Sequence, residues 1–195
     1  MMKKGYRDRY FSDYEAKRVP ANNAKGFRIE YQYSGFFCQW YDEKGHSRRF
    51  LKYRVAVVEL LSLAAFVLSS LQQSQMNTAA LAAGFGICAI VPWLLELAGS
   101  VMFLAAVEYV KERTRSETDT MIVGGAVIRT PLLLLSLLFG VIAVHRSGPA
   151  TVQDVTALVG MLVSAGLSVT AAILHKKLYY RMYKNDGNGA PGKEC

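Results

Sequence analysis

Four long apolar stretches, separated by charged or turn-forming residues, constrain this chain more than any other feature. They cover about 55–71, 78–110, 122–144 and 155–174. A helix of about twenty apolar residues crosses the ~30 Å hydrocarbon core of a bilayer, so all but the first are long enough without help. The first can extend its reach because Tyr53 and the long side chains of Lys52 and Arg54 favour the headgroup level. The sequence therefore predicts four membrane-spanning helices.

We expect the fold class to be an all-α membrane protein, a four-helix transmembrane bundle with a small N-terminal cytoplasmic β-hairpin segment. A transmembrane domain over 51–178 would hold spans at about 55–72, 78–100, 122–145 and 155–175. The second apolar stretch is too long for one perpendicular crossing, so we expect either an amphipathic cytoplasmic extension to 113 or a kink at Pro92. Segment 1–50 precedes the domain, and the Gly-rich and Asn-rich tail, 179–195, has the composition of a disordered end.

Basic residues are concentrated at those ends of the apolar stretches that would lie on the same side of the membrane. Of the 23 Lys and Arg residues, 13 lie before the first stretch, 4 lie between Lys111 and Arg129, 5 follow the fourth stretch, and one, Arg146, lies between the third and the fourth. The positive-inside rule then predicts a multi-pass protein of the plasma (cell) membrane with both termini in the cytoplasm. Anionic membrane lipids, rather than nucleic acid, would balance the net charge of +8. The expected headgroup contacts are Arg48, Arg49, Lys52, Arg54, Lys176 and Lys177.

Residues 27–41 show the pattern of a β-hairpin. Apolar and polar residues alternate over 27–33, Ser34 and Gly35 can form a turn, and a second aromatic run follows over 36–41. An isolated hairpin is marginal in water, so we expect its aromatic side chains to lie at the membrane interface, or to offer a strand edge to a partner. The preceding residues, 1–25, could be a nucleic-acid arm or an interfacial helix, and neither pattern is specific.

Three charged residues lie within the expected membrane spans, namely Glu59, Glu96 and Arg129. Counted from the outer ends of their helices, they lie at depths of about 20, 28 and 24 Å, which is nearly one level. Because a charge is expensive inside a bilayer, we expect Arg129 to pair with Glu96, Glu59 or both. Two alternatives are that each side chain reaches separately to the inner headgroups, or that the cluster is a transport or proton site.

Small residues recur every four positions along the second and fourth stretches and predict close helix packing. The fourth stretch carries Thr156, Gly160, Ser164, Ser168 and Ala172, and the second carries Ala80, Gly84 and Cys88. The second stripe continues toward Glu96, which favours an inward-facing acid.

No catalytic motif appears, and no His, Cys or acidic residues have metal-ligand spacing, so we expect no metal and no cofactor. We expect a non-enzymatic accessory or regulatory membrane subunit that acts through another membrane protein or through copies of itself. The alternatives are a small transporter or channel subunit that uses the Glu/Arg cluster, and a membrane-embedded lipid-modifying enzyme.

Overall fold

The computed structural model describes residues 13–22, 26–41, 48–185 and 191–194, and the chain divides into two compact units. The helical unit comprises 41–106 and 116–179. The strand-containing unit is built from the beginning of the chain, residues 107–115 and the C-terminal segment from Tyr180.

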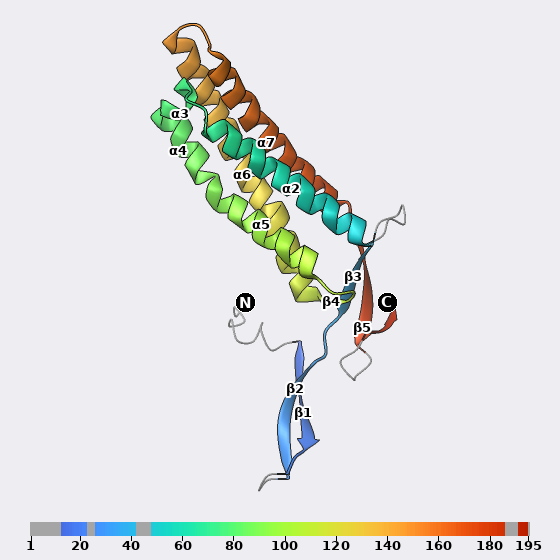
Figure 1. The fold of residues 1–195 in the computed structure, drawn as a ribbon. Coiled ribbons are helices and arrows are strands. Elements are labelled where there is room, and N and C mark those ends of the chain that lie inside the picture. The colour runs from blue at the N-terminus through green and yellow to red at the C-terminus, as the bar shows by residue number, and fades with distance from the viewer. Residues whose placement is uncertain (1–12, 23–25, 42–47, 186–190, 195) are drawn as a thin grey trace, which may run out of the picture. The chain divides into compact units, whose positions relative to one another are not determined.

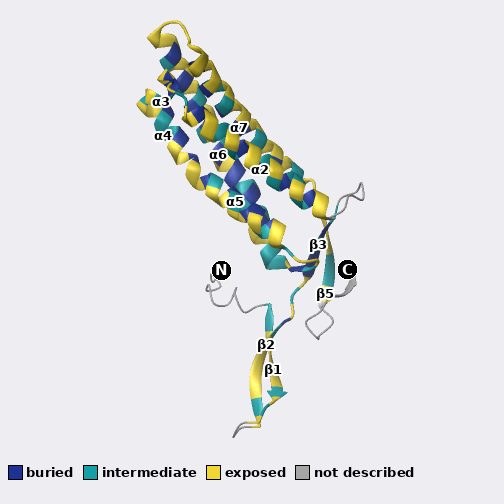
Figure 2. Cartoon of the chain, in the orientation of Figure 1, coloured by how far each residue is buried: buried dark blue, intermediate teal, exposed yellow. Residues whose placement is uncertain are grey.

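Long helices lie alongside one another in the helical unit, and many of their outward side chains are exposed (Figures 1 and 2). Helix α2 packs most extensively against α7 and also contacts α5. A buried core of Met, Leu and Ala side chains lies among α3, α4, α6 and α7. The helices are α2 (Arg48–Ser70), α3 (Gln75–Thr78), α4 (Ala80–Cys88), α5 (Ile90–Ala105), α6 (Glu112–Ser147) and α7 (Val152–Lys176).

Three helical segments among the described residues are long and apolar enough to cross a membrane, which indicates a membrane protein. They are Ala80–Ala105, Glu112–Ser147 and Val152–Lys176. The first predicted span lies within α2, which is not one of these three. Its N-terminal part carries several basic residues and Glu59 lies at its centre, so its apolar portion is short. The prediction of four spans is therefore confirmed only for three.

The second apolar stretch breaks into two helices rather than continuing into the cytoplasm. Ala89 separates α4 from α5, and Pro92 lies three residues later, where it can donate no backbone hydrogen bond to the preceding turn. The expected extension to 113 is wrong, because α5 ends at Ala105 and the chain then enters the two-residue strand β4 (Val110–Lys111). The kink predicted at Pro92 corresponds to the break between α4 and α5, three residues before this proline.

The strands of the N-terminal segment form at the predicted places but with different partners. Strand β2 (Phe27–Tyr33) pairs antiparallel with β1 (Tyr14–Pro20), and not with β3 (Phe37–Tyr41), so the predicted 27–41 hairpin is wrong. Strand β1 shows that 14–20 form a strand and not part of an interfacial helix, whereas 1–12 and 23–25 lie outside the described residues. The β1–β2 pair aligns Tyr14 with Tyr33, whose rings meet edge to face with centroids 5.5 Å apart. Cross-strand aromatic contacts of this kind fix a pairing that sequence alternation alone cannot choose.

Strand β3 instead belongs to a four-stranded sheet with the order β4-β3-β5-β6. Strands β5 (Tyr179–Asn185) and β6 (Pro191–Glu194) come from the tail that was predicted to be disordered, so that prediction is wrong for these residues; 186–190 and 195 lie outside the described part. Tyrosines in β5 explain the difference, because aromatic residues favour strands that can pack. The ring of Tyr183 lies edge to face with that of Tyr109, with centroids 5.1 Å apart. Three aromatic side chains of the predicted hairpin, Tyr33, Phe37 and Trp40, are buried within the protein.

Candidate functional site

A buried ion pair joins α5 to α6 in the middle of the helical unit. Arg129 Nη1 lies 3.2 Å from Glu96 Oε2. The two side chains are only 1% and 0% exposed, so neither reaches water or a headgroup. The structure therefore brings together the pair that the depth comparison predicted, and it excludes separate contacts of the two charges with the membrane surface.

Serine hydroxyls from α7 complete the hydrogen bonding of this pair. Ser168 Oγ lies 3.0 and 3.1 Å from the two carboxylate oxygens of Glu96 and donates to that group. Arg129 Nη2 donates to Ser164 Oγ at 2.9 Å. Ser164 Oγ in turn donates to the carbonyl of Ser62 on α2 at 2.9 Å, and Ser62 Oγ donates to the carbonyl of Ser164 at 2.9 Å. Side chains from four helices are thus joined in one buried polar network.

Glu59 places a second acid beside the pair. It is 2% exposed, and it interacts electrostatically with Glu96 and with Arg129. Neither of its carboxylate oxygens accepts a hydrogen bond from the described residues. Two acids and one guanidinium therefore share a site that excludes water. Because Arg is always protonated, charge balance in such a site requires a proton on one of the two carboxyl groups.

Glycines allow the helices to approach closely enough to seal this network. A Cβ placed on Gly125 of α6 would lie 2.6 Å from Glu96 Cγ and 2.9 Å from the carbonyl oxygen of Pro92. A Cβ on Gly99 of α5 would lie 2.8 Å from Ile122. Both contacts are shorter than side chains tolerate, so only glycine fits at these two crossings. The side chain of Glu96 is consequently covered by the backbone of α6 at Gly125.

The predicted packing stripe on α7 meets α2, with one exception. Gly160 lies against Ser69 and Ala65 of α2, and Ser164 and Ser168 are fully buried. Ala172 is half-buried, whereas Thr156 is exposed. The α7 face is therefore used for packing along most of the predicted length.

The predicted stripe on α4 does not lie on the packed face. Ala80 and Cys88 are exposed, and Gly84 has open space where a Cβ would be. The packed side is instead formed by Ala82 and Gly86, and Ala82 accepts a hydrogen bond of 2.7 Å from Ser136 of α6. The physical reason is helix periodicity, because a four-residue spacing advances about 40° per step around a helix of 3.6 residues per turn, so Ala80 and Gly84 lie on a different face from Glu96.

Some of the basic residues expected at the lipid headgroups are exposed, whereas Lys52 is bound to the protein itself. Arg49, Lys176 and Lys177 are exposed, and Arg54 lies over the ring of Phe50 with its Cζ 5.5 Å from the ring centroid. Lys52 instead donates to the carbonyls of Leu104 and Ala106 at the C-terminal end of α5. The side chain of Arg48 lies outside the described part.

Sequence reasoning missed the serines as partners of the ion pair. Ser164 and Ser168 were recognised only as small packing residues. They lie 10 and 14 residues after Asp154, near the N-terminal end of α7, so they are about 15 and 21 Å along the helix from that end. Only Ser168 comes close to the level of about 24 Å expected for Arg129, so helix depth was a usable signal for Ser168 and not for Ser164. No group of residues in the described part of the chain could hold a metal ion.

Comparison with known proteins gives no relative. No protein-family model matches the chain, and no curated protein and no solved structure is detectably similar to it.

Proposed function

We propose that this chain is a non-enzymatic accessory or regulatory subunit of a membrane assembly, and that the Glu96–Arg129 pair is an internal clamp. In this proposal α2 is a fourth crossing and both termini lie on the cytoplasmic side of the plasma membrane, as the distribution of Lys and Arg favours. The observation that supports the clamp is the complete burial of both charges behind serine hydroxyls and helix backbone.

A sealed ion pair favours a structural role over chemistry. An enzyme that modifies lipids would need its acid to open onto a polar pocket, and Glu96 is fully buried. Breaking a buried pair by removing one partner typically costs about 3–5 kcal/mol, so such a pair holds its helices in one arrangement. A subunit with a fixed helical core then acts through its surfaces.

The β1–β2 pair offers a surface of this kind. Ile29 and Tyr31 lie two residues apart on one face of β2 and are 55% and 62% exposed. Arg28 and Glu30 form an ion pair on the opposite face. Within the described strands this sheet has only two members, so each strand has an edge that no strand covers. An exposed apolar face beside an open edge is suited to a protein partner.

Affinity purification of the tagged full chain in mild detergent tests this proposal. We expect a companion protein, or a defined self-assembly, at fixed stoichiometry. The double variant Ile29→Ser/Tyr31→Ser should lose it, whereas Arg28→Ser/Glu30→Ser, on the opposite face of the same strand, should keep it. Recovery of the wild-type chain as a monomer alone would overturn the proposal.

A second candidate, a small transporter or channel subunit, is favoured by Glu59. An acid that accepts no hydrogen bond from the described residues, beside an ion pair, could bind and release a proton. Flux in liposomes would have to fall on Glu59→Gln and stay unchanged on Glu30→Gln, which alters an exposed acid of β2. Equal flux in both variants and the wild type would remove this candidate.

A further inference from the structure

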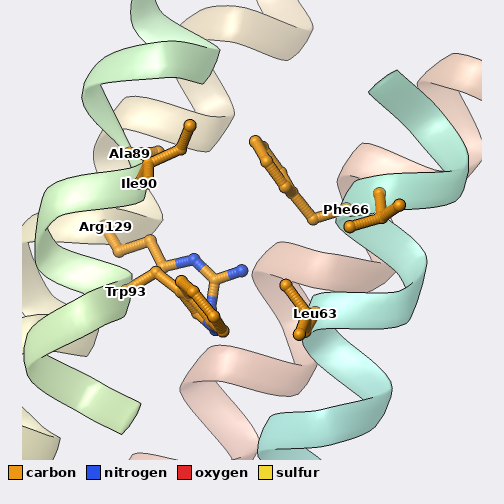
Figure 3. Close-up of a pocket in the computed structure, with 7 residues that line it drawn as sticks. Leu63, Phe66, Ala89, Ile90, Trp93 and Arg129 are labelled. Carbon is orange, nitrogen blue, oxygen red and sulfur yellow. The ribbon is translucent and has the colours of Figure 1, made fainter. Parts of the chain in front are cut away.

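An apolar pocket lies between α2 and the break that separates α4 from α5 (Figure 3). Its cavity volume is about 210 Å³. An engineered cavity of about 150 Å³ with Leu, Ile and Phe walls stays dry and binds benzene, so this pocket can hold a ring or a short branched chain. The lining residues are Leu63, Phe66, Val67, Ala89, Ile90, Trp93 and Arg129.

Two N–H donors at this pocket have no acceptor. Arg129 uses its two terminal nitrogens for Glu96 and Ser164, but its Nε has no hydrogen-bond partner among the described residues, and neither does Nε1 of Trp93. Both atoms are buried. Figure 3 shows the guanidinium of Arg129 extending into the space between Ile90 and Leu63. A buried donor without an acceptor typically costs about 1–3 kcal/mol, which a bound acceptor would recover.

Charge and depth together restrict the kind of acceptor. Glu96 already balances the charge of Arg129, and Glu59 adds a second acid nearby, so a negatively charged ligand would meet two carboxyl groups. Ala89 to Trp93 lie roughly 14–20 Å along the helix from Ala80, which is near mid-depth for a ~30 Å hydrocarbon core. Charged headgroups do not reach this depth, whereas neutral lipid-soluble molecules do.

We propose that this pocket binds a neutral, lipid-soluble molecule through a carbonyl oxygen that accepts the hydrogen bond of Arg129 Nε–H. Val67 and Ile90 are 41% and 38% exposed at the rim, so the ligand enters from the hydrocarbon. Its ring or branched head contacts Phe66, Trp93 and the methyl group of Ala89. Such a carbonyl occurs both in quinone-type rings and in the ester groups of glycerides, and the two sources can be separated by competition.

The fluorescence of Trp93, which lines the pocket, reports ligand binding. The chain has two tryptophans, so in a Trp40→Phe background all tryptophan fluorescence comes from Trp93. Decylubiquinone is titrated into the full chain in lipid nanodiscs, and decylbenzene, which has a similar ring and tail without a carbonyl, is the matched ligand. Dioctanoylglycerol is added as a competitor to test the ester source.

We expect saturable quenching by decylubiquinone, with competition by decylbenzene at least tenfold weaker. Ala89→Leu, which fills the pocket, should abolish saturation, while Ala98→Leu, the same change on the exposed side of α5, should preserve it. Arg129→Lys keeps the positive charge but removes Nε–H, and binding should weaken about tenfold. Competition by dioctanoylglycerol assigns the ester source, and its absence assigns the quinone-type ring.

Two results would overturn the proposal. Quenching that rises without saturation and is unchanged by Ala89→Leu would mean that the quinone only dissolves in the bilayer. Equal competition by decylbenzene would mean that any hydrocarbon fills the pocket and that Arg129 Nε–H selects nothing.

Discussion

Replacing Gly125 by Ala should destabilise the protein, whereas the same change at the neighbouring Gly124 should not. A Cβ at Gly125 would lie 2.9 Å from the carbonyl oxygen of Pro92 and 3.1 Å from the backbone nitrogen of Glu96, so α5 and α6 must move apart. A Cβ at Gly124 would meet only Thr120 of its own helix, at 3.9 Å. Both glycines lie on α6 and both are changed to Ala, but only Gly125 faces another helix.

The magnitude follows from two opposing contributions. Gly to Ala in a helix interior gains about 1 kcal/mol of helix propensity at either site. Forcing an extra methyl group into a packed contact costs about 1–3 kcal/mol, and this applies only at Gly125. Because the propensity gain is common to both variants, the difference between them isolates the steric cost of about 1–3 kcal/mol. For a chain of this length that corresponds to a difference of about 2–12 °C in Tm.

Circular dichroism melting of the wild type and both variants in one detergent measures this difference. We expect Gly125→Ala to melt below Gly124→Ala, with Gly124→Ala at or above the wild type. Equal melting temperatures for the two variants would refute the close approach of α5 to α6 at the ion pair, and with it the enclosure of Glu96 by backbone.

Three further predictions concern the ion pair, a buried tyrosine and a helix cap. Arg129→Gln should lower the free energy of unfolding by about 3–5 kcal/mol, because Glu59 and Glu96 lose the cation that they share. Glu96→Gln should lower it by less, because Glu59 still balances the charge of Arg129. A lower melting temperature for Glu96→Gln than for Arg129→Gln would contradict the shared site. Burial raises the pKa of Tyr33 to about 12, so stability should fall as pH rises from about 10, its unfolded value, toward 12. Tyr33→Phe should reduce this loss of stability above about pH 10, and an unchanged dependence of stability on pH would refute the assignment to Tyr33. Asp154 caps α7 and accepts from a backbone N–H of α3 at 2.7 Å, so its change to Ala should cost about 1–2 kcal/mol, with Gln153→Ala as the neutral control.

The helices were predictable because apolar length is a local property of the sequence. Each of the stretches 78–110, 122–144 and 155–174 coincides with a helical segment that is long and apolar enough to cross a membrane. Depth arithmetic also predicted the contact between Glu96 and Arg129, because rise per residue is nearly constant in a helix.

The partners of the strands were not predictable in the same way, and the buried face of α4 was predicted wrongly. Alternation placed β2 and β3 correctly, but the partners of a strand depend on contacts with distant segments such as Tyr14 and β5. The stripe of Ala80, Gly84 and Cys88 was assigned to the packed face because it continues toward Glu96, but a four-residue spacing drifts by about 40° per step around a helix and leaves that face. The pairing error concerns tertiary context, which a single sequence does not contain, whereas the stripe error concerns helix periodicity, which it does contain.

The contact between α2 and α7 has a consequence for biosynthesis. Ser62 and Ser164 exchange hydrogen bonds between the first and the last long helix of the chain, and Ser69 donates to the carbonyl of Ala157 at 2.6 Å along the same seam. The ribosome releases α2 long before α7, so the hydroxyls of Ser62 and Ser69 lack these partners until α7 has been made. A chain that ends before α7 cannot form these hydrogen bonds, and it leaves uncovered the face of α2 that packs on α7.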